Sequence, residues 1–322
     1  MRQLFDSLVA AIADQQPFAL GIISGVKGSS PQKCGAKALF FGDGRIEGTL
    51  GGGCLEAEVR ERARLALLKQ EPLAFELVLD HDFGWDDGLI CGGKVSGLIL
   101  PHAAKADALW REAACRKETR TWGVRKDFSI AWCDGQDTEE WFYQETVLPP
   151  CELWIAGSGH IARAVTPLAA QLDFKVTVFD DRPALANTRF FPATTRFRVD
   201  DWQKLLAEPM PQWPTFGLVV TRGHQHDALV LREWVHRPFV FLGMIGSRRK
   251  KRLIFSEFLE AGLATKEQLD GVACPVGLDI HSISVHEIAV SVMAQYIQKR
   301  AELVNTTRSP MASAPRLVTV GS

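Results

Sequence analysis

The sequence predicts an α/β protein in which a small α+β domain precedes a Rossmann-like domain with a parallel sheet. In the second half, apolar runs of strand length alternate with helical stretches, and a glycine-rich turn follows the first of these runs. The chain has 322 residues, enough for two domains of ordinary size.

The first domain is expected over residues 1–102. Apolar residues at helical spacing predict a helix over residues 1–16, and Asp43-Gly44 predicts a tight turn between two strands. The predicted strands are Phe18–Ile23, Lys37–Phe41, Ile46–Leu50, Phe75–Leu79 and Val95–Leu100, with a helix from the glycines at 51–53 to Lys69.

Residues 103–150 are expected to be a peripheral segment and linker that ends at Pro149-Pro150, with a strand at Phe128–Cys133. The Rossmann-like domain is expected over 151–303, with strands at Leu153–Ala156, Val176–Phe179, Leu218–Thr221 and Phe239–Ile245. Residues 304–322 lack periodicity and are predicted to be a disordered tail.

Composition excludes several classes of protein. The 37 Lys and Arg residues nearly balance 38 Asp and Glu, so no global field attracts nucleic acid or anionic lipid. No apolar run is long enough for a membrane span, and the start lacks a secretory pattern. The seven cysteines are scattered without a CxxC pair, which argues against a disulfide framework and structural zinc. We therefore expect a cytoplasmic protein.

The segment Leu153–Ala162 reads as a strand that runs into GxGxxA and then a helix. Gly157 and Gly159 would permit a tight turn and a close approach to phosphate at the helix start, and Asp180 lies where such folds hold ribose. His160 is a candidate contact to ligand or metal. In the alternative interpretation, the glycines only allow the strand and helix to pack.

The segment Thr221–Asp227 follows the third predicted strand and contains His224, His226 and Asp227. Its place at the carboxyl edge of the sheet favours a binding role, and its side chains are possible metal ligands. Alternatively, Asp227 caps a helix that starts at Ala228.

The segment Gly243–Lys250 repeats the order of strand, glycine and helix, with three cations in the first helical turn. Cations are unfavourable at a helix N-terminus, so the pattern indicates a bound anion near Gly246, Ser247 and Arg248. The alternative is a solvated basic face that continues through Arg252.

In the first domain, Cys54 follows three glycines at a predicted helix start, and Cys91 precedes Gly92-Gly93. A helix N-terminus lowers a thiol pKa, so either cysteine is a candidate reactive thiolate or soft metal ligand. Buried cysteines are otherwise usually inert.

Eight segments in one order carry a family resemblance: GSSPQKCGAK, GTLGGGCLEAE, GLICGG, IAGSGHIARAV, FDDRP, TRGHQHD, IGSRRK and PVGLDI followed by HEIAVS. From about residue 4 to 300 the chain resembles the XdhC/CoxI family of xanthine dehydrogenase accessory proteins. The resemblance implies a carrier rather than an enzyme. Such a carrier binds the molybdenum cofactor in its molybdopterin form, protects it during sulfuration by a cysteine desulfurase, and delivers it to the molybdenum subunit of xanthine dehydrogenase or a related hydroxylase.

The resemblance implies a set of cofactor-binding residues and no catalytic ones. These residues are Gly51, Gly52, Gly53, Cys54, Glu56, Cys91, Gly92, Gly93, Gly157, Gly159, His160, Asp180, Asp181, Arg182, His224, Asp227, Gly246, Ser247 and Arg248. Cys54 and Cys91 are the expected contacts to molybdenum. The chain departs from the family pattern at Gln32, at Leu100-Pro101 and at Ser284–Glu287.

Three other functions compete with this one. An NAD(P)-dependent oxidoreductase would use the glycine turn and Asp180, and a metal-dependent hydrolase would use His160, His224, His226 and Asp227. A scaffold without a small-molecule ligand would use exposed tryptophans.

The last predicted helix carries Ile288, Ala289, Val292, Met293 and Tyr296 on adjoining faces. This apolar surface is broader than one core stripe needs, so we expect a homodimer. The alternative is that these residues are buried within the monomer.

Overall fold

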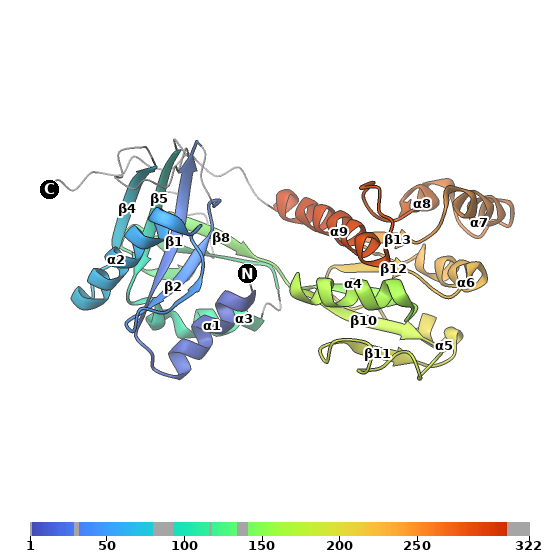
Figure 1. Ribbon diagram of the computed structural model, residues 1–322, viewed down its shortest axis with the longest axis horizontal. Helices are drawn as coiled ribbons and strands as arrows, with labels where there is room; N and C mark the ends of the chain where they lie inside the picture. The colour runs from blue at the N-terminus through green and yellow to red at the C-terminus, as the bar shows by residue number, and fades with distance from the viewer. Residues whose placement is uncertain (1, 29–31, 80–92, 116–117, 134–140, 308–322) are drawn as a thin grey trace. The chain divides into compact units, whose positions relative to one another are not determined.

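The computed structural model describes residues 2–28, 32–79, 93–115, 118–133 and 141–307. The chain divides into two compact units, with Met1–Leu148 in the first and the second beginning at Pro149. The α/β fold class and the Rossmann-like parallel sheet predicted from the sequence are confirmed (Figure 1).

The first unit contains a five-stranded antiparallel sheet in the order β3-β2-β1-β5-β4. Its strands are β1 (Phe18–Lys27), β2 (Lys37–Phe41), β3 (Ile46–Gly48), β4 (Leu73–Leu79) and β5 (Gly93–Leu100). Gly44, with a φ of +88°, lies in the turn between β2 and β3, as the Asp43-Gly44 pair predicts.

Different helices cover the two faces of this sheet, because alternate strand residues point to opposite sides. Helix α2 (Gly53–Lys69) packs Leu55, Val59 and Ala63 against the face that includes Ile23 and Phe40. Helices α1 (Arg2–Ala13) and α3 (Asp107–Cys115) pack on the other face.

The segment expected to be peripheral is built into the first unit. After a short 3₁₀ helix (Ala103–Ala106) and α3, strands β6 (Arg120–Arg125), β7 (Ile130–Trp132) and β8 (Trp141–Val147) form a second antiparallel sheet. Trp110 and Trp122 are fully buried in the same core cluster as α1. Sequence patterning missed β8 because its polar residues hide the alternation.

The second unit has a six-stranded parallel sheet in the order β11-β10-β9-β12-β13-β14. Its strands are β9 (Cys151–Ala156), β10 (Phe174–Asp180), β11 (Arg196–Val199), β12 (Thr215–Val219), β13 (Phe241–Met244) and β14 (Val272–Ala273). The strand order reverses between β9 and β12, which is the switch point where such sheets bind ligands.

Two layers of helices cover this sheet. Helices α4 (His160–Gln171) and α9 (Val285–Thr307) pack on one face. The other face is covered by α5 (Trp202–Leu206), α6 (His224–Trp234), α7 (Arg248–Glu260) and α8 (Lys266–Asp270) (Figure 1). No helix among the described residues has the length and apolarity needed to cross a membrane.

The face of α9 chosen from the sequence lies in the core. Ala289, Val292, Met293 and Tyr296 are buried against the sheet and α4, so they cannot form a dimer surface. A helix with apolar residues around much of its circumference gives no sequence indication of which side faces inward. Residues 304–307, expected to be disordered, continue α9 as a helix, and the rest of the expected tail lies outside the described residues.

Tyr296 joins α9 to the centre of the parallel sheet. Its hydroxyl donates a 2.6 Å hydrogen bond to the carbonyl of Gly217 in β12, and its ring packs edge-on against Phe241. Complete burial raises the pKa of Tyr296 well above its ordinary value.

We expect Tyr296→Phe to lower the free energy of unfolding by about 1–2 kcal/mol, because the buried carbonyl loses its donor without a change in packing. Urea unfolding measures the difference. Gln298→Ala, at an exposed position of the same helix, is the matched control and should change the free energy little. An unchanged stability in Tyr296→Phe would contradict the assigned role of the hydroxyl.

Candidate functional site

The carboxyl edge of the parallel sheet gathers most of the predicted site residues of the second unit. The turn after β9 leads through Gly157–Gly159 into α4, and the turn after β12 leads through Thr221–Gly223 into α6. Since β9 and β12 are neighbours in the sheet, the two helix starts lie side by side at the switch point.

The two glycines of the first turn have different roles. Gly157 has a φ of +112°, and a Cβ there would lie 2.4 Å from the carbonyl oxygen of Val220. Gly157 is therefore required for packing, as the alternative interpretation of the sequence held. Gly159 has an ordinary φ of −73°, and a Cβ there would meet no atom within 4 Å. The space beside Gly159 is open.

Asp180, at the end of β10, holds the glycine turn in place. One carboxylate oxygen accepts hydrogen bonds from the backbone N–H and the hydroxyl of Ser158, both at 2.7 Å. The main-chain N–H, Nε and Nη2 of Arg182 donate to the same carboxylate at 2.8–2.9 Å. The aspartate expected to contact a ligand is thus used inside the protein.

Burial of Asp180 by itself raises the pKa of this carboxyl group. The hydrogen bonds from Arg182 and Ser158 and the positive charge of Arg182 act in the opposite direction and outweigh burial. The pKa of Asp180 therefore lies below its ordinary value, and the group is ionised at neutral pH.

Asp181 forms a more exposed pair with an arginine from the neighbouring turn. Its two oxygens accept from Nη1 and Nη2 of Arg222 at 3.3 and 2.9 Å. Arg222 also lies 2.9 Å from Nε2 of His226. The His226 ring is therefore in hydrogen-bonding contact with the Arg222 guanidinium group.

Asp227 is buried and pairs with Lys250 of α7. One carboxylate oxygen accepts from the backbone N–H and hydroxyl of Thr221 at 3.0 and 2.7 Å, and the other contacts the Lys250 ammonium group. Helix α6 begins at His224, so the prediction that Asp227 caps a helix starting at Ala228 is wrong. The helix starts earlier because Gly223 is its N-cap.

The absence of a side chain at Gly246 makes this ion pair possible. A Cβ at Gly246 would lie 2.9 Å from Cδ of Lys250, so the glycine leaves room for the lysine to reach Asp227. Of the three cations predicted to surround an anion, Lys250 is thus engaged within the protein, while Arg248 and Arg249 are exposed.

Neither α4 nor α6 has a side-chain cap at its N-terminus. The N-cap residues are Gly159 and Gly223, and a Cβ at either position would meet no atom within 4 Å. The first N–H groups of a helix have no partner within the helix and carry a partial positive charge. In contrast, Ser247 accepts from the backbone N–H of Lys250 and caps α7.

Exposed cationic or basic side chains stand at the starts of these helices. His160 begins α4, His224 begins α6, and Arg248 begins α7. Two uncapped helix starts suit an anion of phosphate size. Among the described residues, no three His, Cys, Asp or Glu side chains are grouped so that they could hold a metal ion.

The glycine turn of the first unit encloses a carboxylate from its own chain. Gly51, Gly52 and Gly53 all have positive φ values, between +57° and +117°. Glu56 accepts from the Thr49 hydroxyl at 2.9 Å and from the Leu50 N–H at 3.0 Å, with the N–H of Gly52 at 3.3 Å. The N–H groups of this turn are therefore engaged by an anion of the chain itself.

The predicted cysteines cannot be placed relative to this turn. Cys54 is the second residue of α2, but its side chain lies outside the described part of the structure. Cys91 and Gly92 also lie outside the described residues, and Gly93 is the first residue of β5.

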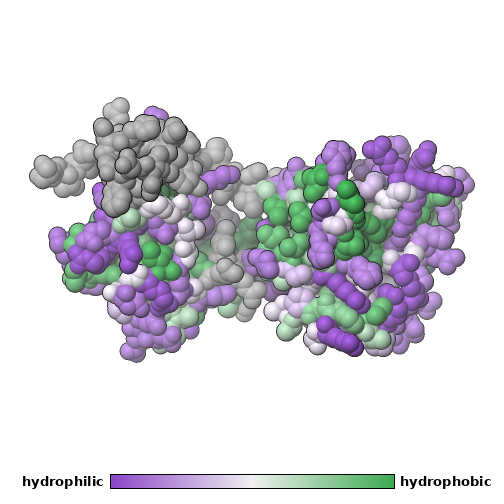
Figure 2. All heavy atoms as spheres, in the orientation of Figure 1, coloured by the Kyte–Doolittle hydropathy of each residue, from purple (hydrophilic) through white to green (hydrophobic). Residues whose placement is uncertain are grey.

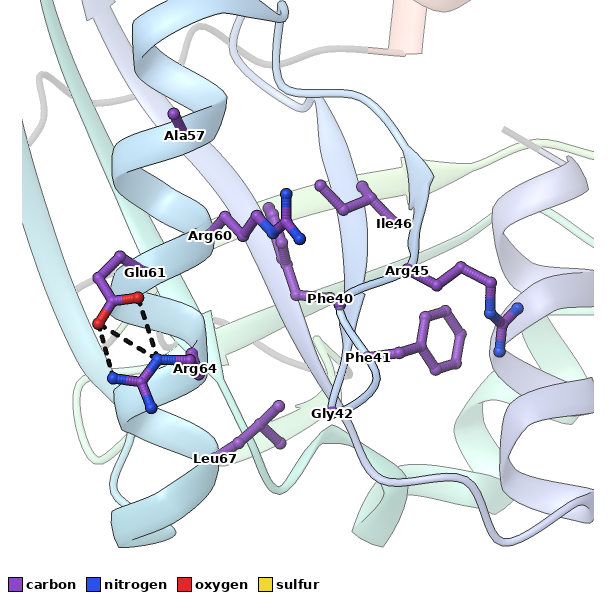
Figure 3. A pocket seen from close by; sticks show the side chains of 11 residues that line it. Phe40, Phe41, Gly42, Arg45, Ile46, Ala57, Arg60, Glu61, Arg64 and Leu67 are labelled. Atoms are coloured by element: carbon purple, nitrogen blue, oxygen red, sulfur yellow. Dashed lines mark hydrogen bonds and ion pairs between the residues drawn. The ribbon is translucent and has the colours of Figure 1, made fainter.

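Two of the hollows beside the β2–β3 hairpin of the first unit differ in their lining. One, of about 300 Å³, lies between the hairpin and α2 and is bordered by Arg45, Arg60 and the Arg64–Glu61 ion pair (Figure 3). None of the predicted site residues lines it. The other, of about 740 Å³, is lined by Gly48 and Thr49 and by the buried Lys37–Glu145 pair, whose closest N···O distance is 2.7 Å. Thr49 connects this larger hollow to the glycine turn.

Two family models match the chain. One, described as the XdhC and CoxI family, matches residues 11–79, and the other, described as the XdhC Rossmann domain, matches residues 153–296. The matched segments fall in the first and second units, respectively.

Three similar proteins span most of this chain. The Escherichia coli K12 uncharacterized protein YqeB is 28% identical over 88% of this chain, which spans only 43% of YqeB. A Bacillus subtilis 168 protein named as a probable xanthine dehydrogenase component is 26% identical, with 91% and 96% of the two chains covered. The molybdenum cofactor insertion chaperone PaoD of Escherichia coli K12 is 23% identical, with 93% and 88% covered.

A solved structure has the same fold. A xanthine dehydrogenase from Bacillus halodurans superposes with a TM-score of 0.79 and 24% identity, over 96% of this chain and 98% of that chain. At this identity, the likeness establishes the architecture of the chain.

We expect Asp180→Asn to lower the free energy of unfolding at pH 7 by roughly 2 kcal/mol or more, because charge-assisted hydrogen bonds are lost. The lowered pKa of Asp180 means that its contribution is present at neutral pH and is lost as the pH falls through the folded-state pKa. Urea unfolding at pH 7 and pH 3 should therefore show a gap between wild type and variant that narrows in acid. Asp201→Asn, at an exposed aspartate of the same unit, is the control. A gap that stays constant with pH would contradict the prediction.

Proposed function

The chain belongs to the XdhC and CoxI family, and we propose that it is a cytoplasmic carrier of the molybdenum cofactor. In this proposal it binds the molybdopterin form, protects it and supports its sulfuration by a cysteine desulfurase. It then delivers the cofactor to the molybdenum subunit of xanthine dehydrogenase or of a related hydroxylase.

The observation that carries the proposal is the pair of open, glycine-capped helix starts at the switch point. Molybdopterin ends in a phosphate, and uncapped N–H groups next to exposed cations are suited to hold such a group. Gly159 and Gly223 leave open space at these helix starts, and the first residues of α4, α6 and α7, which are His160, His224 and Arg248, are exposed.

The names of two relatives support the same role. One is a molybdenum cofactor insertion chaperone, and the other is a probable component of xanthine dehydrogenase. Both alignments cover more than nine tenths of this chain, so they include both units.

The carboxylates of the site favour a carrier over a catalyst. A general base must reach its substrate with an available lone pair. Asp180 and Asp227 are each 1% exposed and are engaged by residues of the chain itself. These two carboxylates are therefore suited to stabilising the loops of a binding surface.

In the first unit, we propose Cys54 and Cys91 as candidate contacts to molybdenum. A hollow of about 740 Å³ is within the size range of small-molecule sites, and Thr49 on its wall belongs to the glycine turn that precedes Cys54. Thiolates are soft ligands suited to a molybdenum centre, so Cys54 and Cys91 are the proposed contacts. Gly51–Gly53 and Glu56 would then set the shape of this turn.

We also propose that the protein forms a homodimer whose interface is the outer side of α9. Val290 and Ile297, 51% and 37% exposed, lie seven residues apart on α9, or about two helical turns, and Ile283, 91% exposed, lies just before the helix. In Figure 2, apolar side chains gather over α9. A stripe centred on Val290 is complementary to itself when a second copy packs antiparallel, as a two-fold interface requires.

Ile283 is held in place before α9 begins. Glu287 accepts from the backbone N–H groups of Ile283 and Ser284 at 2.7 and 2.8 Å, and Ser284 accepts from the N–H of Glu287. This reciprocal capping fixes the backbone of an exposed isoleucine, so little conformational entropy is lost when a second copy covers it.

The carrier function is tested by filling the open helix start with a carboxylate. Aspartate is a good N-cap residue, so Gly159→Asp should fold at least as stably as wild type while its charge occupies the phosphate position. We expect the variant to retain at least tenfold less pterin and molybdenum than wild type after anaerobic incubation with isolated cofactor and desalting. Thr265→Asp makes the same charge change at the N-cap of α8 and should retain as much as wild type. Undiminished retention by Gly159→Asp would refute the proposed phosphate site.

We expect Val290→Glu to weaken the dimer at least tenfold, because two carboxylates would meet at the two-fold axis. Size-exclusion chromatography with light scattering across a range of protein concentrations measures the change. Leu253→Glu, at a leucine of α7 that is 64% exposed, is the control and should leave the mass unchanged. A wild-type protein that stays monomeric, or a Val290→Glu variant that stays dimeric, would rule out this interface.

A further inference from the structure

The smaller hollow beside the β2–β3 hairpin is not used by the proposed carrier function. It has a volume of about 300 Å³ and lies between the hairpin and α2 (Figure 3). Its lining comes from residues 40–46 and from α2, so it belongs to the first unit alone. None of the residues proposed to hold the molybdenum cofactor lines it. A ligand of this hollow would therefore be a second ligand of the protein.

Apolar side chains form the floor of the hollow. Phe40 and Ile46 point from the hairpin toward α2, and Leu67 points from α2 toward the hairpin (Figure 3). All three belong to the core cluster that α2 forms with the sheet, with Phe40 buried and the other two half-buried. The lining also includes Gly42 and Ala57, whose small size leaves the space open. Such a floor favours an apolar group over water.

Arg60 supplies a positive charge beside this floor. Its side chain extends from α2 toward the hairpin (Figure 3). A Cβ at Gly44 would lie 3.0 Å from Nη2 of Arg60, so the absence of a side chain in this turn makes room for the guanidinium group. The φ of +88° at Gly44 also favours glycine for the turn itself. Within the described part of the chain, the guanidinium of Arg60 has no hydrogen bond and no ion pair.

The other charged residues that line the hollow are balanced. Arg64 and Glu61 are joined by three hydrogen bonds of 2.7–3.2 Å (Figure 3). Arg45 points away from α2, where its guanidinium carbon lies 3.8 Å from the centre of the Phe41 ring, and it pairs with Glu47. Among the residues of this lining, the guanidinium that extends from α2 to the hairpin is therefore the unbalanced charge.

These features define the chemistry of a suitable ligand. A guanidinium group presents parallel N–H donors that match the two oxygens of a carboxylate. One cation balances a single negative charge, whereas a phosphate monoester with nearly two charges needs a second cation. The apolar floor suits a hydrocarbon group. A volume of about 300 Å³ is at the lower end of the range for small-molecule sites, so the hydrocarbon group must be short.

We propose that this hollow binds a monocarboxylate with a short apolar body, with the carboxylate on Arg60 and the body on the apolar floor. The same chemical group occurs in free organic acids and at the C-terminus of a protein chain that ends in an apolar residue. This site goes beyond the carrier function, and neither proposal depends on the other.

Isothermal titration of the full-length protein tests both sources of the carboxylate. Hexanoate represents a free acid, and the peptide acetyl-Gly-Gly-Leu represents a chain end. We expect at least one of them to bind once per chain with a dissociation constant below about 1 mM. Hexan-1-ol and the C-terminal amide of the peptide lack the charge and should bind at least tenfold more weakly.

The outcomes of this titration separate the sources. Binding of hexanoate alone supports a free acid as the ligand, and binding of the peptide alone supports a chain end. Binding of both supports the shared chemical group. If neither acid binds, or if the uncharged compounds bind as tightly, the proposal is wrong.

Chain length tests the apolar floor. Butanoate has the same carboxylate as hexanoate but two fewer methylene groups, and each buried methylene contributes about fourfold in affinity. Butanoate should therefore bind at least tenfold more weakly than hexanoate, and acetyl-Gly-Gly-Ala more weakly than acetyl-Gly-Gly-Leu. Equal affinities within both pairs would show that the hydrocarbon stays in water and would contradict the proposed floor.

A pair of variants tests the role of Arg60. Arg60→Gln removes the charge at an exposed helix position, so it should unfold thermally as wild type does but bind the acid at least tenfold more weakly. Arg62→Gln is the matched control, because Arg62 lies on the same helix, pairs with Glu58 and does not line the hollow. It should bind as wild type does. Undiminished binding by Arg60→Gln, or an equal loss in Arg62→Gln, would overturn the inference.

Discussion

The burial of two charged aspartates at the carboxyl edge of the parallel sheet is the constraint on which the second unit depends. A buried carboxylate is tolerated only with a cation and enough hydrogen-bond donors around it. Asp180 meets this condition with Ser158 and Arg182, and Asp227 meets it with Thr221 and Lys250. Each set joins the end of one strand to the turn or helix beside it, so the two networks fix the loops that surround the switch point. The backbone of these loops is positioned before any ligand arrives.

This arrangement separates the groups that hold the site from the groups that face outward. The carboxylates are consumed inside the protein, while the uncapped N–H groups of α4 and α6 are left for an external partner. The first unit also has a glycine-rich turn before a helix, but the N–H groups of this turn are not left open. The Glu56 side chain folds back and accepts hydrogen bonds from them. Similar glycine-rich sequences therefore produce one turn that is filled and one that is open. The difference lies in whether a nearby acidic side chain can reach the donors.

The sequence predicted the parallel sheet well because four of its strands are apolar runs separated by helical stretches, and their observed positions overlap those expected. It missed β11 (Arg196–Val199), whose alternating arginines resemble a polar loop, and β14, which has only two residues. The sequence predicted a turn at Gly157 and Gly159, but it could not separate their roles, because the two glycines look alike until the distance from Gly157 to Val220 is known. The partners of Asp180 and Asp227 depend on side chains that meet only in the folded chain. Local spacing could suggest acidic residues near a ligand, but it could not indicate that their lone pairs were already taken.

The use of the Asp180 carboxylate inside the protein bears on the alternative function of an oxidoreductase with the same architecture. Fold and glycine turn are shared by proteins with unrelated activities, so they carry little information about chemistry by themselves. What differs is the number of free acceptors and free donors at the switch point. A dinucleotide site needs an acceptor for ribose and donors for pyrophosphate. Here Asp180 and Asp181 are bound to arginines, while Gly159 and Gly223 leave donors exposed. Exposed N–H donors at two helix starts are suited to an anion that itself brings only acceptors, and a terminal phosphate is such a group.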